Sequence, residues 1–379
     1  MRVVIVGGGV AGLALARGLR DHEVEILEES PEPRTAGGSV SIWPAGTGIL
    51  RELGVDPLEA GRRLATMGSH TASGRRMFTV DLAPAESRYG HPTVHIGRRE
   101  LVGLLARGLD VTYGARVTRV NPDRAEVELA DGRTVRGDVL VGADGRRSAV
   151  RQALWGRDRA RLSGWVTWQG YAELPTGPEV TMYTGRGGLC GLAPSGPDRL
   201  LWWLDVRSRP GRPLWGDDPD PVGRLRRRFG TWAAAPVRQA LDAIKDAEFF
   251  PHYRHWVPAV WGRGPTTLAG DAAHTMPPTM AQGANQALED AWALSRSIGG
   301  DLRAYERRRA RIARRPALLA ATEMTNVQNP TVSLFSDRMA TRAYTAWLRT
   351  ASSYLRREVD GRMGFADRGG AAGGGLTDA

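Results

Sequence analysis

The pattern of apolar and polar positions at the start of the chain predicts a strand, a tight turn, a helix and a second strand. Residues 2–6 form a β-branched run that ends at three consecutive glycines. Residues 10–19 then repeat apolar side chains at helical spacing, and residues 24–27 form another short strand-like run. A strand, a crossover helix and a second strand in this order are typical of a parallel sheet.

Two later regions have the period of two that is typical of strands. Residues 111–141 alternate in short runs around a turn at Asp131 and Gly132, which predicts a β-meander followed by a strand that returns to the parallel sheet. Residues 160–206 contain aromatic-rich runs separated by glycine, proline and aspartate. This region predicts a second, mostly antiparallel sheet.

The last third of the chain begins with a strand and continues as helices. Residues 266–269 predict the strand, and a helix begins near Gly283. A second, arginine-rich helix is predicted over residues 301–315, and Pro316 is expected to end it. Its basic residues are expected to form a solvated helix face: Arg307, Arg308, Arg309 and Arg311. The glycine-rich tail predicts disorder.

Charge and cysteine content narrow the class of protein. Lysine and arginine number 52 against 41 aspartates and glutamates, which gives a net charge of +11. Because Lys245 is the only lysine and the arginines are scattered along the chain, this excess fits a coding bias at least as well as nucleic-acid binding. A single cysteine, Cys190, excludes an internal disulfide and is typical of a reducing compartment. Since no apolar run reaches about 18 residues, we expect a cytoplasmic protein without a membrane span.

The N-terminal glycines form a dinucleotide-binding fingerprint. Gly7-x-Gly9-x-x-Gly12 lies between the first strand and the helix, and Glu28 follows about 20 residues later at the end of the second strand. The glycines permit a tight turn, a close approach of the backbone to a pyrophosphate, and close packing of the helix on the strand. Helix amides then face the phosphates, and Glu28 can accept from a ribose hydroxyl. A plain NAD-dependent dehydrogenase would use this motif alone.

Two further segments follow predicted strands. The second reads GADGRRSAVR from residue 142, and the third reads GDAAH from residue 270 and AQGANQ from residue 281, with EDA at residues 289–291. In this order, the three segments resemble those of the flavin-dependent aromatic hydroxylases of the para-hydroxybenzoate hydroxylase type, the single-component flavin monooxygenases. A dehydrogenase would leave the second and third segments unexplained.

The resemblance implies a set of cofactor residues. The first motif would hold the ADP half of FAD, Arg98 matches the family arginine that contacts the cofactor, and Asp144 belongs to a motif linked to both FAD and NAD(P)H. Asp271 would hydrogen-bond the ribityl chain. The implied cofactor-binding residues are Gly7, Gly9, Val10, Ala11, Gly12, Glu28, Glu29, Arg98, Asp144, Gly145, Gly270, Asp271, Pro277, Gly283, Ala284 and Asn285. The flavin-proximal residues are Pro277, Gln282 and Gly283, and no catalytic acid or base is assigned.

The third segment departs from the family at one position. The family has Gly-Gln-Gly before the final helix of the motif, whereas this chain has Ala281-Gln282-Gly283. A β-carbon is added where the backbone approaches the ring, so we expect a small shift of the loop or the flavin. Free amides at the start of this helix would stabilise negative charge on a reduced flavin. The nearly uncharged residues 275–281 would keep the site dry.

The resemblance implies an α/β fold with interleaved domains. A Rossmann-like FAD-binding domain of the glutathione-reductase type would be joined to an antiparallel β-sheet substrate domain and to C-terminal helices. The expected division is 1–71, 96–158 and 262–300 for the FAD-binding domain, 72–95 and 159–261 for the substrate domain, 301–365 for the helical region and 366–379 for a disordered tail.

Aromatic residues are the candidates for a substrate cavity. A period of two places Trp165 and Tyr171 on one face of the second sheet and Trp168 on the other, and it separates Trp202 from Trp203. The candidate pocket residues are Trp43, Trp168, Tyr183, Cys190 and Trp202. Each of these side chains also fits a packing role in the core.

The activity that the resemblance implies is FAD-dependent monooxygenation. NADH or NADPH would reduce FAD, and O2 would form a flavin C4a-hydroperoxide that hydroxylates a bulky aromatic or apolar small molecule. The 12 tryptophans fit such a substrate, and specialised metabolism, for example antibiotic biosynthesis, is the expected context. An epoxidase or Baeyer–Villiger-type oxygenase acting on a related substrate would use the same motifs. A flavin halogenase is disfavoured, because Lys245 and the WVTWQG segment do not fit its lysine and its Trp-x-Trp-x-Ile-Pro element.

Three further expectations concern partners and side chains outside the cofactor set. The protein is expected to be a monomer or homodimer that binds no nucleic acid. The histidines are not spaced as metal ligands, so no metal site is expected. His274 is expected to be a structural loop residue rather than a proton shuttle.

Overall fold

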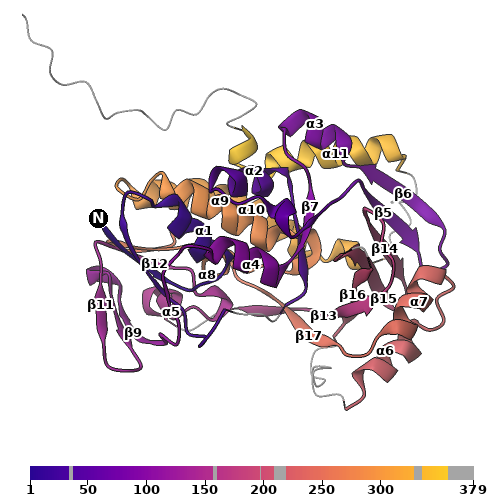
Figure 1. Ribbon diagram of the computed structural model, residues 1–379, viewed down its shortest axis with the longest axis horizontal. Coiled ribbons are helices and arrows are strands. Elements are labelled where there is room, and N and C mark those ends of the chain that lie inside the picture. The colour runs from indigo at the N-terminus through magenta and orange to yellow at the C-terminus, as the bar shows by residue number, and fades with distance from the viewer. Residues whose placement is uncertain (34–36, 157–159, 197, 209–218, 328–334, 357–379) are drawn as a thin grey trace, which may run out of the picture.

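The two larger β-sheets lie at opposite ends of the molecule, and the C-terminal helices extend from one to the other (Figure 1). The computed structural model describes the chain except for residues 34–36, 157–159, 197, 209–218, 328–334 and 357–379. The predicted disordered tail, 366–379, lies outside the described residues.

A five-stranded parallel sheet forms one end, in the spatial order β18-β12-β1-β2-β8. Its strands are β1 (Arg2–Val6), β2 (Glu23–Leu27), β8 (Val111–Thr112), β12 (Val139–Gly142) and β18 (Thr266–Leu268). β1 and β12 are apolar and almost wholly buried, as strands are when helices cover both faces of a sheet. Since α1 (Val10–Gly18) connects β1 to its parallel neighbour β2, the predicted strand–helix–strand unit is confirmed.

A small antiparallel sheet precedes β12. It consists of β9 (Val117–Asn121), β10 (Glu126–Leu129) and β11 (Thr134–Arg136). The turn between β10 and β11 contains Gly132, whose φ of +87° is a conformation that glycine adopts without a Cβ clash. β12 then pairs with β1 in the parallel sheet, as the alternation predicted.

A seven-stranded sheet forms the other end, in the order β17-β13-β16-β15-β14-β5-β6. Its strands are β5 (Thr66–Thr71), β6 (Arg76–Asp81), β13 (Arg161–Glu173), β14 (Glu179–Gly185), β15 (Gly188–Pro194), β16 (Arg199–Arg207) and β17 (Glu248–Arg254). Neighbouring strands are antiparallel except for β14 and β5. β5 therefore belongs to this sheet, although the expected division placed residues 66–71 in the FAD-binding domain.

Helices cover and connect these sheets. They are α2 (Pro44–Glu52), α3 (Ala83–Tyr89), α4 (Arg98–Ala106), α5 (Ala149–Trp155), α6 (Pro221–Phe229), α7 (Ala235–Ala243), α8 (Asp271–His274), α9 (Gln282–Ser295), α10 (Leu302–Ala321) and α11 (Asp337–Thr350). A second small sheet contains β3 (Ser39–Ile42), β4 (Arg62–Arg63) and β7 (Val94–Gly97). α6 and α7 lie against the seven-stranded sheet, and α9 and α10 lie near the parallel sheet (Figure 1).

Two apolar clusters lie on opposite faces of the seven-stranded sheet. One contains Trp168 and Trp202 together with side chains of α6 and α7. The other contains Tyr171 and Trp203 together with Tyr344 of α11. The separation of Trp168 from Tyr171, and of Trp202 from Trp203, is as predicted from the period of two.

The structure corrects the sequence prediction for the arginine-rich helix in two respects. α10 continues through Pro316 to Ala321, because Pro316 is buried in the core and its packing offsets the backbone hydrogen bond that proline cannot donate. Arg309 is not on a solvated face, since its side chain is wholly buried and its Nε lies 2.7 Å from Oδ1 of Asp290. Arg307 and Arg311 are exposed, as predicted.

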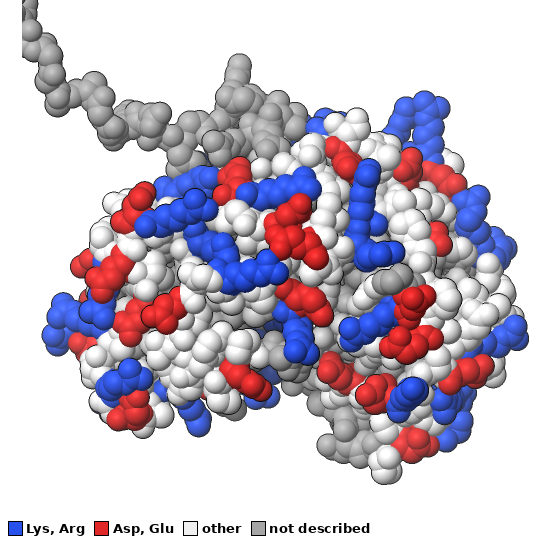
Figure 2. All heavy atoms as spheres, in the orientation of Figure 1, with Lys and Arg blue, Asp and Glu red and all other residues white. Residues whose placement is uncertain are grey.

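The predicted α/β class, with a parallel sheet, antiparallel sheets and C-terminal helices, is confirmed. On the face drawn in Figure 2, basic and acidic side chains are interspersed, so this face carries no extended surface of one sign. Within the described ranges, no helix combines the length and the apolar character needed to cross a membrane.

Candidate functional site

The three sequence motifs meet at one edge of the parallel sheet. The amide of Ala143 donates to the carbonyl of Val6 over 2.7 Å, and the amide of Ala269 donates to the carbonyl of Gly142 over 2.9 Å. These bonds join the carboxyl ends of β1, β12 and β18, which point the same way because the strands are parallel. This edge is where open parallel sheets bind their ligands.

Two glycines of the first motif are required by close backbone contacts. Gly7 has φ of +113°, and a Cβ on it would lie 2.3 Å from the carbonyl oxygen of Ala143. A Cβ on Gly12 would lie 2.0 Å from the carbonyl oxygen of Gly7. Gly9 differs, because a Cβ there would have no atom within 4 Å. Gly9 is the N-cap residue of α1, and the free amides at the start of a helix can bind a phosphate.

Glu28 is held at the end of β2 by backbone amides. Its Oε2 accepts from Gly8 over 2.7 Å and its Oε1 accepts from Ser30 over 2.9 Å. A carboxylate at the end of this strand is the group that accepts from a ribose hydroxyl in dinucleotide-binding folds. Glu29, the next residue, is exposed.

Asp144 connects the second motif to the start of α5. Its Oδ2 accepts from the amides of Ala149 and Val150, at 2.7 and 3.3 Å. Its Oδ1 is buried with no hydrogen-bond partner among the described residues. Burial raises the pKa of Asp144, against the hydrogen bonds that favour the charged form. An orphaned acceptor at this edge fits a hydroxyl-bearing ligand.

The third motif packs directly on the first. Gly270 has φ of +61°, and a Cβ on it would lie 2.9 Å from the Cβ of Ala11 in α1. Asp271 begins α8 and its side chain is exposed at the same edge. This contact brings the carboxylate expected to bind the ribityl chain next to the helix expected to bind the pyrophosphate.

A buried network supports the Gly270 turn from behind. Oδ2 of Asp290 accepts from the amide of Gly270 over 2.8 Å and lies 2.6 Å from Nε2 of His274. Although burial opposes it, contact with His274 and Arg309 lowers the pKa of Asp290. The structure thus places His274 in a supporting contact.

The loop before α9 takes a left-handed turn. Ala281 has φ of +48°, a conformation that favours glycine, so the alanine follows a glycine-like path. No side chain of the described residues caps the start of α9, which leaves its first amides available. Asn285 holds the neighbouring β3–α2 junction, because its Oδ1 accepts from the amide of Trp43 over 2.9 Å and its Nδ2 donates to the carbonyl of Ser41 over 2.9 Å.

The remaining predicted residues lie around this edge. Pro277 and Gln282 are buried, whereas Gly283 and Ala284 are half-buried. Arg98 is exposed at the start of α4, where its amide donates to the carbonyl of Gly38 over 3.0 Å.

Three supporting residues were missed by sequence reasoning. Arg151 is buried, and its Nη1 donates to the carbonyls of Ala272 and Ala273 at 2.8 and 3.1 Å. Asp290 and Arg309 are the other two. Arg151 and Asp290 lie within the motif segments, so their place in the sequence could have predicted a supporting role. Nothing in the sequence distinguishes Arg309 from the neighbouring arginines of the same helix.

The predicted pocket residues lie in two different places. Trp43 precedes α2 and is buried beside Asn285. The other four are buried in the cluster beneath α6 and α7: Trp168, Tyr183, Cys190 and Trp202. Burial raises the pKa of Cys190 far above that of a free thiol. The alternation of side chains along the strands predicted that the seven-stranded sheet has two faces. It could not predict which face lines a pocket, because the residues that cover each face come from distant parts of the chain.

The opposite face of the seven-stranded sheet is the one that approaches the motif edge. A Cβ on Gly38 would lie 2.7 Å from the side chain of Gln169, and the Tyr171 hydroxyl lies 3.3 Å from Oγ of Ser39. Trp203 shares this face, and its indole lies across Gly191. These side chains are half-buried and uncharged.

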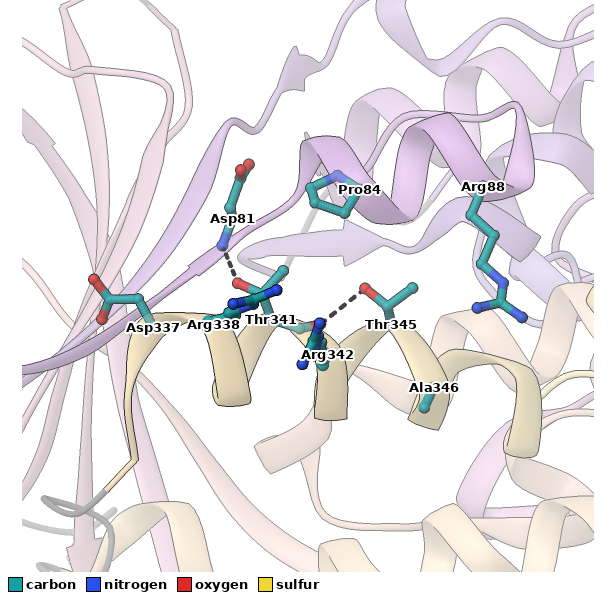
Figure 3. A pocket seen from close by; sticks show the side chains of 9 residues that line it. All are labelled: Asp81, Pro84, Arg88, Asp337, Arg338, Thr341, Arg342, Thr345 and Ala346. Atoms are coloured by element: carbon teal, nitrogen blue, oxygen red, sulfur yellow. Dashed lines mark hydrogen bonds between the residues drawn. The ribbon is translucent and has the colours of Figure 1, made fainter.

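A separate groove of about 670 Å³ lies between α3 and α11 (Figure 3). Its lining residues are Asp81, Pro84, Arg88, Asp337, Arg338, Thr341, Arg342, Thr345 and Ala346. The amide of Asp81 donates to the hydroxyl of Thr341 over 3.0 Å, which ties β6 to α11. The groove shares no residue with the three motifs.

Comparison with protein families gives one match that covers most of the chain. A model of the FAD binding domain matches residues 1–317. The chain belongs to the FAD binding domain family. The predicted resemblance is confirmed. The glycine contacts, the open side at Gly9 and the orphaned Asp144 oxygen fit that cofactor.

Curated relatives of this family member are flavin enzymes. The chain is 33% identical to an Aurachin C monooxygenase/isomerase of Stigmatella aurantiaca, over 79% of this chain and 80% of the relative. It is 34% identical to a 3-amino-4-hydroxybenzoate 2-monooxygenase of Streptomyces platensis, over 79% of each chain. It is 32% identical to an FAD-dependent urate hydroxylase of Klebsiella oxytoca, over 82% of this chain and 86% of the relative. The predicted enzyme class, an FAD-dependent monooxygenase, is confirmed.

Solved structures share the fold. Klebsiella pneumoniae HpxO complexed with FAD and uric acid superposes with a TM-score of 0.79 at 28% identity, covering 95% of each chain. A 2,6-dihydroxypyridine-3-hydroxylase of Arthrobacter nicotinovorans superposes with a TM-score of 0.72 at 20% identity, covering 85% of this chain and 90% of the other.

Proposed function

We propose that this flavoprotein uses NADH or NADPH and O2 to hydroxylate a bulky aromatic or apolar small molecule in specialised metabolism. The observation that carries the proposal is the convergence of three separated motifs at one sheet edge, joined through β3 to the face of the second sheet that carries Gln169 and Tyr171. The aurachin and aminohydroxybenzoate monooxygenases among the relatives support an aromatic substrate.

The chain's own residues hold the cofactor in this proposal. Amides at the start of α1 bind the pyrophosphate, Glu28 accepts from a ribose hydroxyl, and Asp271 accepts from the ribityl chain. The bound FAD supplies the electron transfer and oxygen activation. The uncapped start of α9 stabilises negative charge at the flavin ring, and the buried Pro277 excludes water there.

The substrate lies on the face of Gln169, Tyr171 and Trp203 in this proposal. Trp203 provides an aromatic surface, and Gln169 provides both a donor and an acceptor for the substrate's polar group. The Arg199 guanidinium lies 3.8 Å from the centre of the Tyr171 ring, so Tyr171 is given a role at the border of this surface. Trp43 belongs to the wall beside α9. The other predicted pocket residues, Trp168, Tyr183, Cys190 and Trp202, are given packing roles, since they line the face covered by α6 and α7.

Oxygen consumption by the purified protein tests the proposal. FAD-loaded protein is mixed with NADH or NADPH, and O2 uptake is recorded with a panel of neutral bicyclic and monocyclic aromatics. We expect a substrate that raises O2 uptake and yields a product heavier by one oxygen atom. Reduction of the bound flavin by neither nucleotide, with or without aromatics, would contradict the proposal.

A second candidate follows from one relative's name. Because the aurachin enzyme is both a monooxygenase and an isomerase, oxygen insertion with rearrangement is a further possibility for this site, and epoxidation or Baeyer–Villiger oxidation belongs to it. Product structure separates these reactions from hydroxylation.

A further inference from the structure

A buried polar cluster lies where the seven-stranded sheet meets the end of α10. It contains Thr167 of β13, Asp205 of β16, His252 of β17 and Glu323, which follows α10. Their exposed fractions are 4%, 3%, 1% and 2%. Glu323 also has φ of +51°, a strained conformation for a residue with a side chain. Nothing in the FAD site as described uses these groups.

The four side chains form a continuous chain of short contacts. Oγ1 of Thr167 lies 2.5 Å from Oδ1 of Asp205 and 2.6 Å from Nε2 of His252. Nδ1 of His252 lies 2.9 Å from Oε1 of Glu323. Ser163 and Asn326 donate to Glu323 as well, at 2.6 and 3.0 Å. The cluster therefore ties three strands to the end of α10.

Counting donors fixes the protons of this chain. A threonine hydroxyl has one hydrogen, so if Asp205 is ionised the hydroxyl donates to it and Nε2 of His252 must donate to the hydroxyl. Nδ1 must donate to Glu323, which makes His252 an imidazolium. If Asp205 carries the proton instead, the hydroxyl donates to Nε2 and His252 is neutral. Both forms hold the same number of protons, so Asp205 and His252 share one proton through Thr167.

The environment favours retention of this proton. Burial raises the pKa of Asp205 to about 6. Burial lowers the pKa of His252, but the hydrogen bond with Glu323 and the charges of Asp205 and Glu323 outweigh it, so that the pKa is raised. These two carboxylates are the ionisable groups that act on His252 within the described residues. Cys190, on the other side of the sheet, has a thiol whose pKa is raised by burial and then by Asp205.

The cluster does not have the arrangement of a metal site. In the part of the chain that the structure describes, no three His, Cys, Asp or Glu side chains are grouped so that they could hold an ion.

The elements that the cluster joins also hold the two ends of the flavin-facing loop, residues 275–281. At one end, the amide of His255, just after β17, donates to the carbonyl of Thr275 over 2.9 Å. At the other end, the hydroxyl of Thr279 donates to the carbonyl of Ala320 in α10 over 3.1 Å. His252 and Glu323 each lie three residues beyond one of these anchors. Their contact therefore joins the two segments that carry the anchors.

We propose that the cluster of Thr167, Asp205, His252 and Glu323 positions residues 275–281 against FAD, and that the shared proton keeps this positioning intact. The proposal rests on the proposed function for the role of the loop. Loss of the proton leaves two buried carboxylates around a neutral imidazole, so the junction of β17 and α10 opens and the loop loosens. All four are positioning residues, since none touches the reacting atoms.

Flavin fluorescence measures the FAD dissociation constant, Kd, of the full-length protein in steps from about pH 6 to about pH 9, the range in which a raised histidine pKa lies. For the wild type, we expect Kd to rise about tenfold over this range, which corresponds to a pKa difference of one unit between the FAD-bound and FAD-free forms. A Kd that stays constant with pH would overturn the proposal without any variant.

Variants separate positioning from packing. Thr167→Val removes the hydroxyl that connects Asp205 to His252, and Thr167→Ser keeps it. We expect the valine variant to bind FAD weakly with a flat pH profile and the serine variant to restore the wild-type slope. Glu323→Gln is expected to move the rise in Kd to lower pH, because a neutral amide no longer raises the histidine pKa.

Thr184→Val is the matched control. Thr184 is a buried threonine of the same sheet, on β14, and its hydroxyl donates to the carbonyl of His70 over 3.5 Å. We expect a wild-type pH slope for this control. The proposal is overturned if Thr167→Val and Glu323→Gln change Kd by the same factor at every pH, or by no more than the control does. The cluster would then contribute only to packing. The readout needs only FAD, so failure of both nucleotides to reduce the flavin would overturn the proposed function and leave this test of the cluster intact.

Discussion

At the edge of the parallel sheet, close contacts between backbone atoms decide which residue type a position accepts. On the seven-stranded sheet, the role of a side chain depends on the face of the sheet on which it lies. Gly7 and Gly12 approach neighbouring carbonyl groups so closely that a Cβ would collide with them. Trp202 and Trp203 are adjacent and of the same type, yet one packs beneath α6 and α7 and the other lies on the face toward the motif edge. Close contacts in the first region therefore restrict the residue type at single positions. In the second region, the orientation of the whole strand decides which side chains lie on each face.

The largest effect is expected for Gly12→Ala, which tests the backbone-determined edge. Its Cβ would lie 2.0 Å from the carbonyl oxygen of Gly7, so the backbone of α1 or of the turn must move. We expect a loss of about 4 kcal/mol of unfolding free energy, and no retained FAD. Urea unfolding and the flavin absorbance of the purified protein measure both.

Gly103→Ala is the control for this change. Gly103 lies inside α4, and a Cβ there would have no atom within 4 Å. Since alanine favours a helix over glycine, we expect this variant to be more stable by up to about 1 kcal/mol. Retention of FAD by Gly12→Ala at wild-type stability would refute the close-contact explanation.

The next effect compares the two faces of the second sheet. Trp202→Ala leaves a cavity beneath α6 and α7 and is expected to cost about 3 to 5 kcal/mol of unfolding free energy, with little change in KM for the aromatic substrate. Trp203→Ala is expected to cost less stability, because the side chain is half-buried, and to raise KM. Denaturation curves and steady-state kinetics of both variants measure this difference. If the two variants exchange these properties, the assignment of the substrate face is wrong.

A smaller effect is the pH dependence of the buried cluster. Burial raises the pKa of Asp205 to about 6 in the folded chain, and the pKa of His252 is also raised. A group whose folded pKa is raised stabilises the fold at low pH and loses this contribution as the pH rises through the folded value. Because Asp205 and His252 share one proton, the cluster's contribution should fall by about 3 kcal/mol as the pH rises above 6 and that proton is lost. Urea unfolding at stepped pH checks this, and Asp205→Asn should flatten this dependence.

The smallest effect is expected for Ala281→Gly. Ala281 adopts φ of +48°, which costs an alanine about 1 kcal/mol relative to glycine. We expect the glycine variant to be slightly more stable to heat and to keep FAD. Ala284→Gly, inside the first turn of α9, should change stability in the opposite direction by about as much. A destabilised Ala281→Gly variant would mean that the methyl group packs usefully against its neighbours.

The sequence was informative where backbone geometry restricts residue type. Gly7 and Gly270 each adopt a backbone conformation, and make a close contact, that a residue with a Cβ could not adopt without strain. These glycines are therefore recognisable in the sequence, because each follows an apolar run that predicts a strand. The sequence was misleading where packing overrides local preference. Pro316 continues a helix because its neighbours in the core compensate for the missing donor, and Arg309 is buried because Asp290 lies opposite it.

The amino-acid sequence by itself determined the parallel sheet, the three motifs, the family and the existence of two faces on the second sheet. These features follow from local periodicity and from single residues whose backbone conformation or close contacts exclude a Cβ. The tertiary structure decided which face of that sheet lies toward the motif edge and that His252, Asp205 and Glu323 meet at the end of α10. These contacts join residues far apart in the chain, and no local pattern encodes which segments will cover which face.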